Sequence, residues 1–127
     1  MSKAAVRGLW ADIDAQNWAG LAFWFAPGAV VEWPNTNERF TVQGFTRANS
    51  HYPGNWRVTL VSVERLENGG VVSVARVCAA EGGFSLHAVS FFTFEKGGKI
   101  SALREYWAED GPAPGWRQSL GLARPIE

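Results

Sequence analysis

Glycine-bearing turns at regular spacing are the feature that most restricts the fold of this chain. They lie at residues 68–70, 81–83 and 97–98, and each joins two segments of strand-forming residues. Glycine supplies the positive φ that tight hairpin turns require. The sequence therefore predicts an antiparallel meander of four strands: Trp56 to Leu66, Val71 to Ala80, Phe84 to Glu95 and Lys99 to Trp107.

The N-terminal part has helical periodicity instead. Apolar residues at Val6, Leu9 and Ile13 are three and four positions apart, a spacing that places them on one face of a helix. We expect a helix from Lys3 to Ala15 and a second, short helix from Trp18 to Phe25, which a Pro-Gly pair ends. The two helices would form an N-terminal pair.

Shorter elements connect the helical pair to the meander. Two short strands are expected, Ala29 to Trp33 and Phe40 to Val42, separated by the polar loop Asn35 to Arg39. A short helix from Gln43 to His51 follows them. The tail beyond residue 110 is expected to be turn or coil, with Trp116 packed back against the body.

Helices followed by a long meander predict an α+β fold in which the helices cover one face of a curved, mostly antiparallel sheet. The length of 127 residues and the hydrophobic content of 46% suit one compact domain, residues 1–127, with a core of its own. No repeat or linker divides the chain.

Charge and composition exclude several classes of function. Twelve basic and twelve acidic residues balance, so the chain lacks the positive surface by which proteins bind nucleic acid or an anionic membrane. The single cysteine and two distant histidines predict no disulfide, metal site or cofactor. With no signal peptide and no apolar run of membrane-spanning length, the expected location is cytoplasmic.

Seven tryptophans stand out against two tyrosines. Large aromatic side chains usually fill a core or an interface. Alternatively, several of them line a pocket, because ligand pockets are mostly apolar and aromatic with a few placed polar groups. The candidates for such a wall are Trp24, Trp33 and Trp107.

The last hairpin indicates which side chains share a face of the sheet. A two-residue turn at Gly97-Gly98 places Lys96 opposite Lys99 and therefore Glu105 opposite Ser90. Counting along the strands gives a face with room beside a carboxylate: Ser73, Ala75, Ala88, Ser90, Leu103, Glu105 and Trp107. The opposite face carries Arg76, Cys78, His87, Val89, Phe91, Arg104 and Tyr106.

Two passages of the sequence resemble a known superfamily. Residues 25–34 read F-A-P-G-A-V-V-E-W-P, and the last predicted strand contains G-K-I followed by R-E-Y-W. Both are similar to the nuclear transport factor 2-like (NTF2-like) superfamily, which includes ketosteroid isomerase-like and SnoaL-like proteins. The resemblance covers nearly the whole chain and implies a cone-shaped α+β barrel. That fold hosts isomerases, cyclases, hydrolases, dehydratases and non-catalytic binding domains.

The resemblance also implies a role for Glu105. Related epoxide hydrolases of the superfamily have an acidic residue of the catalytic pocket at the matching position, which makes Glu105 the candidate general acid or base. Burial without a positive partner would raise its pKa toward the range that proton transfer needs. An ion pair with an arginine at the edge of the sheet is the alternative.

Other catalytic residues of the superfamily have no counterpart here. The resemblance places Trp33 where ketosteroid isomerases have their acidic base, and Leu9 or Trp10 near their oxyanion-donating tyrosine. Arg76 matches the arginine of the epoxide hydrolases but lacks their flanking carboxylates. Neither of those two reactions is therefore expected.

Two functions remain from the sequence. The first is an apolar small-molecule binding domain with undetermined activity, and its expected ligand contacts are Trp24, Trp33, Tyr52, Ser90 and Trp107, with His87 and Arg76 as further polar groups. The second is a small isomerase, cyclase or hydrolase that uses Glu105 on a cyclic or polyketide-like substrate. In both cases the apolar outer face of the sheet predicts a homodimer.

Overall fold

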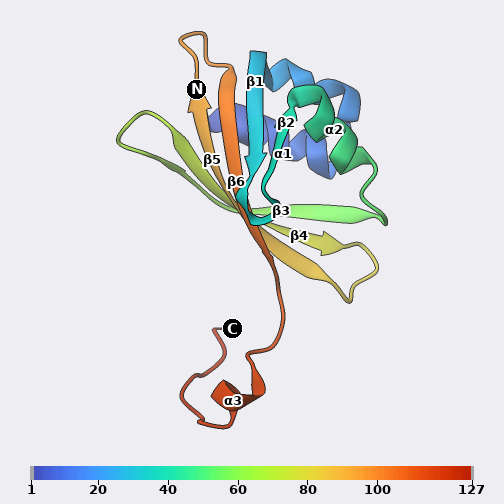
Figure 1. Ribbon diagram of the computed structural model, residues 1–127, viewed down its shortest axis with the longest axis vertical. Helices are drawn as coiled ribbons and strands as arrows, with labels where there is room; N and C mark the ends of the chain where they lie inside the picture. The colour runs from blue at the N-terminus through green and yellow to red at the C-terminus, as the bar shows by residue number, and fades with distance from the viewer. Residues whose placement is uncertain (1, 127) are drawn as a thin grey trace.

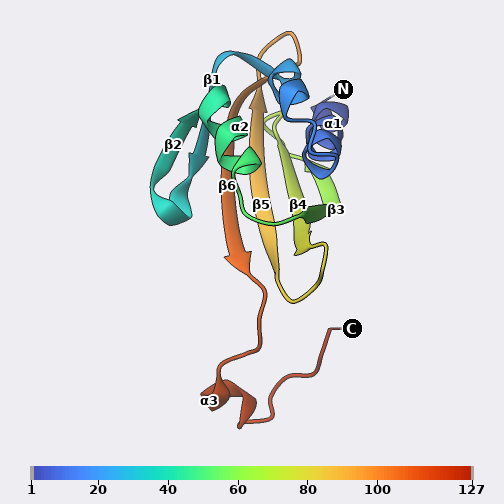
Figure 2. The ribbon, with the colours of Figure 1, turned by 90° about the vertical axis from the view of Figure 1, so that its right-hand side faces the viewer.

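Helices lie on one side of a curved sheet in the computed structural model, which describes residues 2–126 (Figures 1 and 2). The sheet has six strands in the order β2-β1-β6-β5-β4-β3. Three helical segments cover its concave face: α1 (Ser2–Asp14), the 3-10 helix η1 (Trp18–Trp24) and α2 (Val42–Ser50). A one-turn 3-10 helix, η2 (Pro34–Thr36), joins the first two strands.

The strands form one open sheet, with β2 and β3 at its edges. Neighbouring strands are antiparallel except β1 and β6, which pair in parallel. The predicted α+β fold is thus confirmed, although the sheet curves without closing into a barrel. The strands are β1 (Phe25–Trp33), β2 (Glu38–Thr41), β3 (Trp56–Arg65), β4 (Val71–Ala79), β5 (Ser85–Phe94) and β6 (Ile100–Glu109).

The first strand is longer than its sequence suggests. β1 begins at Phe25, so the Pro27-Gly28 pair lies inside the strand instead of ending a helix. Gly28 adopts a φ of +76°, and the pairing of β1 with β6 shifts register between Phe25 and Val30. Because glycine tolerates this conformation, the pair forms an irregularity within the strand.

The last hairpin has the predicted pairing but a different turn. Ser90 lies opposite Glu105, as expected. The amide of Glu95 donates to the carbonyl of Lys99 (2.9 Å), however, so the loop is one residue longer than the predicted two. The register shifts again between Thr93 and Phe94. The two one-residue changes cancel, so the side chains from Ala102 onward keep their predicted faces, whereas Ile100, before the shift, turns inward opposite Phe94 and is buried.

The hairpin between β4 and β5 is also wider than expected. The amide of Ala79 donates to the carbonyl of Phe84 (2.9 Å), so residues 80–83 form the loop. This loop exceeds a two-residue turn by an even number, which leaves the faces unchanged because side chains alternate with period two. Ser73 accordingly pairs with Ser90 on the inner face.

The hydrophobic core lies between the concave face and the helices. Val6 and Leu9 of the predicted α1 stripe are buried there, with exposed fractions of 0% and 1%. Phe45 of α2 and Phe92 of β5 are equally buried. Each such side chain stabilises the fold by about 1.5–3 kcal/mol through its removal from water.

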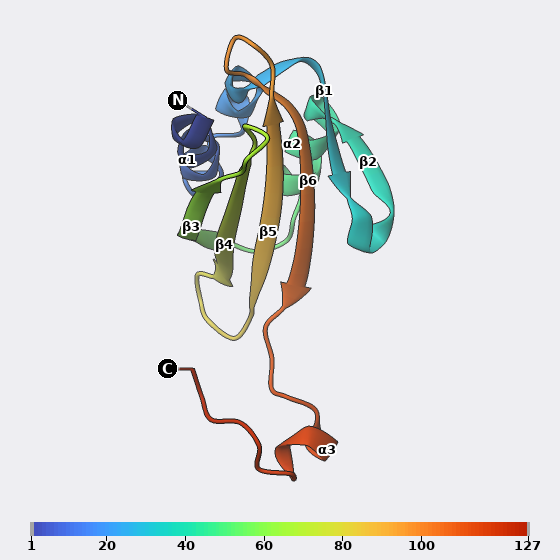
Figure 3. The ribbon, with the colours of Figure 1, turned by 90° about the vertical axis from the view of Figure 1, so that its left-hand side faces the viewer.

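The C-terminal tail projects from the body as an arm (Figures 2 and 3). It contains one helical turn, α3 (Gly115–Gln118), and residues 111–126 are all exposed. The expected packing of Trp116 against the body is wrong, because 67% of this side chain is exposed. Pro112 and Pro114 explain the difference, since proline and the residue before it favour extended backbone.

Within residues 2–126, no helix combines the length and the apolar character needed to cross a membrane.

A tight contact joins α1 to η1 and gives a test of the fold. A Cβ atom at Gly8 would lie 2.2 Å from the indole of Trp24, whose N–H donates to Asp12 (2.7 Å). Gly8→Ala would displace that indole, so we expect the substitution to destabilise the protein by about 1–3 kcal/mol in urea unfolding.

Gly44→Ala in α2 is the matched control. A Cβ there meets its nearest neighbour at 3.4 Å, which is ordinary contact. Alanine favours helix over glycine, so this variant should be as stable as the parent or more stable by up to about 1 kcal/mol. Equal stabilisation by both substitutions would contradict the proposed packing of Trp24 on α1.

Candidate functional site

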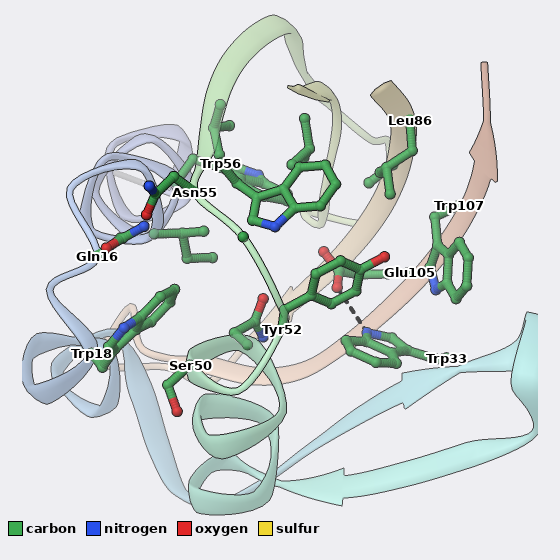
Figure 4. Close-up of a pocket in the computed structure, with 17 residues that line it drawn as sticks. Gln16, Trp18, Trp33, Ser50, Tyr52, Asn55, Trp56, Leu86, Glu105 and Trp107 are labelled. Carbon is green, nitrogen blue, oxygen red and sulfur yellow. Dashed lines mark hydrogen bonds between the residues drawn. The ribbon is translucent and has the colours of Figure 1, made fainter. Parts of the chain in front are cut away.

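A pocket lies between the helices and the inner face of the sheet (Figure 4). Its volume is about 190 Å³, and apolar and aromatic side chains provide most of its surface. The residues that line it are Trp10, Ile13, Gln16, Trp18, Trp33, Asn49, Ser50, Tyr52, Gly54, Asn55, Trp56, Val58, Val77, Leu86, Ala88, Glu105 and Trp107.

Glu105 is the buried carboxyl group of this pocket. Only 6% of the residue is exposed. The indole Nε1 of Trp33 donates to its Oε1 atom (2.9 Å; Figure 4), and the hydroxyl of Ser90 donates to its Oε2 atom (2.7 Å). The side chain therefore links β6 to the end of β1 and to β5.

Glu105 has no positively charged partner. Among residues 2–126, every ion pair with an arginine or histidine belongs to another carboxylate: Asp14, Glu32 or Asp110. Removal from water raises the pKa of the Glu105 carboxyl above its ordinary range, and the hydrogen bonds from Ser90 and Trp33 offset only part of that rise. The arginine pairing considered from the sequence is thus absent from the described contacts.

A row of polar side chains crosses the inner face at this level. Ser73, Ser90 and Glu105 lie side by side on β4, β5 and β6. Ser73 and Ser90 are fully buried. Trp10 of α1 donates its indole N–H to Ser73 (3.1 Å), as Trp33 does to Glu105 at the other end of the row. Ser73 thus satisfies the indole of Trp10 and Glu105 that of Trp33, while the two small serines leave room beside the carboxyl group.

Aromatic side chains form much of the pocket wall and contact one another edge to face. The ring of Trp33 meets Phe40 and Trp107 edge to face, with centroids 4.7 and 6.4 Å away. Tyr52 is 44% exposed and stands edge to face with Trp56, with 5.1 Å between ring centroids. In Figure 4 the ring of Tyr52 is drawn between those of Trp56 and Trp33.

The structure brings most of the predicted site residues together. Glu105, Trp33, Tyr52 and Trp107 line the pocket, and Ser90 contacts Glu105 without lining it. Trp24 does not belong to this set: its indole packs over Gly8 and donates to Asp12. The prediction for Trp24 fails because the orientation of the short η1 helix decides where its rings point.

The two further polar candidates lie elsewhere. His87 and Arg76 are on the outer face, where the Nδ1 atom of His87 lies 2.5 Å and the Arg76 guanidinium 4.0 Å from Asp110. They pair with a surface carboxylate instead of Glu105. The polar loop that follows β1 also remains outside the pocket: Asn35 accepts from the backbone amide of Trp107 (2.9 Å).

Several lining residues were not predicted as site residues. Trp10 and Ile13 come from α1, Trp18 from η1, and Asn49 from α2. The apolar stripe of α1 indicated that Ile13 faces the sheet, but it did not indicate whether this side chain lies in the core or lines a pocket. Trp56 reaches the pocket from the first residue of β3, and only the three-dimensional path of the edge strand shows this.

The described residues offer no obvious place for a metal. No group of three or more histidine, cysteine, aspartate or glutamate side chains gathers within residues 2–126 in a way that could hold a metal ion.

Fold and site together define a protein of the NTF2-like class, with a pocket between the helices and the concave sheet. Residues 6–111 match the family model of the SnoaL-like domain, so the chain belongs to the SnoaL-like family. No curated protein sequence matches the chain.

Solved structures agree with this assignment. A "putative ketosteroid isomerase" from Kribbella flavida has a TM-score of 0.79 and 25% identity, covering 99% of this chain and 91% of that one. An NTF2-like protein of unknown function from Burkholderia xenovorans has a TM-score of 0.78 and 20% identity over 99% and 95%. The epoxide hydrolase/cyclase-like enzyme SalBIII has a TM-score of 0.69 and 15% identity over 84% and 90%.

The raised pKa of Glu105 predicts a specific dependence of stability on pH. The folded state holds the proton more tightly than the unfolded state, whose glutamate titrates at about pH 4.3. Unfolding stability should therefore fall as the pH rises from that value through the folded pKa, and remain level beyond it. In the Glu105→Gln variant, whose amide can bond both Trp33 and Ser90, this decrease of the free energy of unfolding with rising pH should be absent.

Urea unfolding of both proteins across pH measures the difference. The informative quantity is the free energy of unfolding of the parent minus that of Glu105→Gln, because other titrating groups then cancel. A difference that rises with pH would mean that the folded state lowers the pKa of Glu105, contrary to its desolvated position.

Proposed function

We propose that this protein binds an apolar small molecule in the pocket and that Glu105 transfers a proton to or from it. The observation that carries the proposal is a buried carboxyl group in an apolar pocket, without a charged partner and with a raised pKa. A pKa near the working pH is what a general acid or base requires. An isomerase-type or cyclase-type proton transfer fits this arrangement.

The two hydrogen bonds of Glu105 determine which of its two oxygens can carry a proton. The Trp33 indole can only donate, so Oε1 remains an acceptor in both protonation states. The Ser90 hydroxyl can donate or accept, and it can therefore turn when Oε2 takes up a proton. Oε2 is accordingly the atom that carries the proton of the acid form.

The size of the pocket limits the ligand. An engineered apolar cavity of about 150 Å³ holds benzene, and this pocket has about 190 Å³. A molecule of one ring with short substituents fits that space, whereas the four fused rings of a steroid do not. Glu105 provides the buried polar contact that would orient a carbonyl or hydroxyl group of such a ligand.

Similar proteins support proton transfer as a class of chemistry. SalBIII is described as acting in pyran ring formation, and the Kribbella flavida neighbour as a "putative ketosteroid isomerase". The present chain has Trp33 where the resemblance placed the base of ketosteroid isomerases. Its Glu105 would therefore act from the last strand, with Trp33 as a hydrogen-bond donor to it.

A non-catalytic binding domain is the second candidate. The observation in its favour is that, among the residues that line the pocket, only Glu105 and Tyr52 carry titratable side chains. Tyr52 is 44% exposed, and the described hydrogen bonds of the Glu105 side chain go to Trp33 and Ser90 instead of to a second acid or base. In this alternative Glu105 serves only to hold a polar group of the ligand.

Solvent exchange of an enolisable ligand distinguishes the two candidates. Cyclohexenone is a one-ring probe whose acidic C–H protons exchange for deuterium when a base removes them. We expect the protein to accelerate this exchange, as followed by proton NMR in D₂O, and Glu105→Gln to reduce the acceleration about 10²–10⁴-fold.

Glu32→Gln is the matched control for this experiment. Glu32 is the outer-face carboxylate that pairs with Arg39 and Arg104, and those hydrogen bonds lower its pKa. Its replacement should leave the exchange rate unchanged. Saturable binding of the probe with no acceleration in the parent protein would favour the binding domain instead.

Ligand size can be tested by quenching of tryptophan fluorescence. We expect cyclohexenone to quench the pocket tryptophans in a saturable manner and a steroid ketone to leave them unquenched. Leu86→Ala shortens a lining side chain and should admit bulkier substituents. Tighter binding of the steroid than of the one-ring ketone to the parent protein would contradict the limit set by the pocket volume.

The expected binding partners and cellular location of the protein are also proposals. The outer face carries Val30, Phe91 and Tyr106, which are 36–42% exposed. We propose that this apolar face pairs two copies of the chain into a homodimer. A role without nucleic acid or membrane, in the cytoplasm, agrees with the balanced charge of the sequence.

A further inference from the structure

The C-terminal arm, residues 111–126, carries large apolar side chains that are mostly exposed. Trp116, Leu120 and Leu122 have exposed fractions of 67%, 58% and 77%. The hydrogen bonds of residues 113–121 all join residues of the arm to one another. Water contact of so many large apolar groups on one short segment is unfavourable and marks an interaction surface.

The direction of the arm is fixed at its start. The amide of Asp110 donates to the carbonyl of Ser85 (2.9 Å), and its carboxylate accepts from the Ser85 hydroxyl (2.6 Å). Hydrogen bonds from Ser85 and His87 lower the pKa of Asp110, so this anchor is ionised at neutral pH. Pro112 and Pro114 follow and favour extended backbone, which directs the arm away from its own sheet (Figures 2 and 3).

A second apolar surface without a partner lies on the outer face of the same chain. We call it the outer groove; Val30, Phe91, Ala102 and Tyr106 contribute its apolar wall, and its volume is about 670 Å³. Phe91 and Tyr106 stand edge to face across it, with centroids 6.2 Å apart. The groove is formed in part by β6, the strand from which the arm leaves.

We propose that residues 111–126 dock as an exchanged arm in the outer groove of a second copy of this chain. Each copy has one arm and one groove, so two copies related by a twofold axis cover both surfaces at once. A single copy does not, because its arm is directed away from its own groove. The proposal is independent of the chemistry of Glu105, which lies on the opposite face of the sheet.

The groove contains Val30, Phe91 and Tyr106, the residues of the outer face that the proposed homodimer buries, so the docked arm is itself part of the contact between the two copies. Trp116 is the largest anchor, and tryptophans in central pockets contribute strongly to association. The arm is already ordered by its prolines and by the helical turn of α3, so docking fixes fewer backbone torsions than docking of a flexible tail.

A double-mutant cycle on the dissociation constant of the dimer tests the contact. Trp116→Ala removes the anchor of the arm, and Phe91→Ala removes one wall of the groove. We expect each variant of the full chain to raise the dissociation constant at least about tenfold in sedimentation velocity. If arm and groove touch, the double variant should be weaker by less than the product of the two single effects.

Arg117→Ala is the matched control, because it changes an exposed side chain of the same helical turn without removing apolar surface. It should leave the dissociation constant unchanged. Thermal unfolding of each monomer checks folding, which we expect Trp116→Ala and Arg117→Ala to leave unaffected because both side chains are exposed.

The proposal is overturned by a parent protein that stays monomeric over the accessible concentrations. It is equally overturned by a dimer that Trp116→Ala leaves intact, or by strictly multiplicative effects of Trp116→Ala and Phe91→Ala. None of these outcomes depends on the deuterium-exchange assay, so loss of catalysis by Glu105→Gln and loss of the dimer remain separate findings.

Discussion

The removal of the Glu105 carboxyl group from water is the constraint on which the rest of the inner face depends. A buried carboxylate without hydrogen bonds would be strongly destabilising. Trp33 from β1 and Ser90 from β5 supply those bonds, and each can do so only while its strand stays paired in register with β6. The burial of this carboxyl group therefore depends on the parallel pairing of β1 with β6. It also depends on the small residues of the polar row, which leave room beside it.

The sequence allowed the face of Glu105 to be predicted because alternation along a strand is insensitive to even changes in loop length. Both hairpin loops that mattered are longer than assumed, at Glu95–Lys99 and at Ala79–Phe84. In the first a second register shift compensates, and in the second the excess is even. Glu105, Ser90 and Trp107 therefore share the inner face as predicted, with Trp33 close by.

Two of the incorrect predictions, those for Trp24 and Trp116, concern side chains whose direction depends on tertiary contacts. Trp24 and Trp116 lie on short helical turns, where a small change of orientation moves a ring from a pocket to a surface. No periodicity in a segment of this length specifies that orientation. Tertiary packing also explains why Trp10 and Trp56 line the pocket: the packing of α1 and the path of β3 bring their rings there.

The parallel pairing of β1 and β6 has a consequence for the order of folding. Trp33 and Glu105 are 72 positions apart, so this contact closes a long loop of chain. Contacts of high sequence separation form slowly, because the entropy of loop closure must be overcome before they stabilise anything. On the ribosome, β1 emerges together with its antiparallel neighbour β2 but long before its parallel neighbour β6. The helices and the first strands can begin to collapse early, but the carboxyl group and its indole donor meet only when nearly the whole domain has been synthesised.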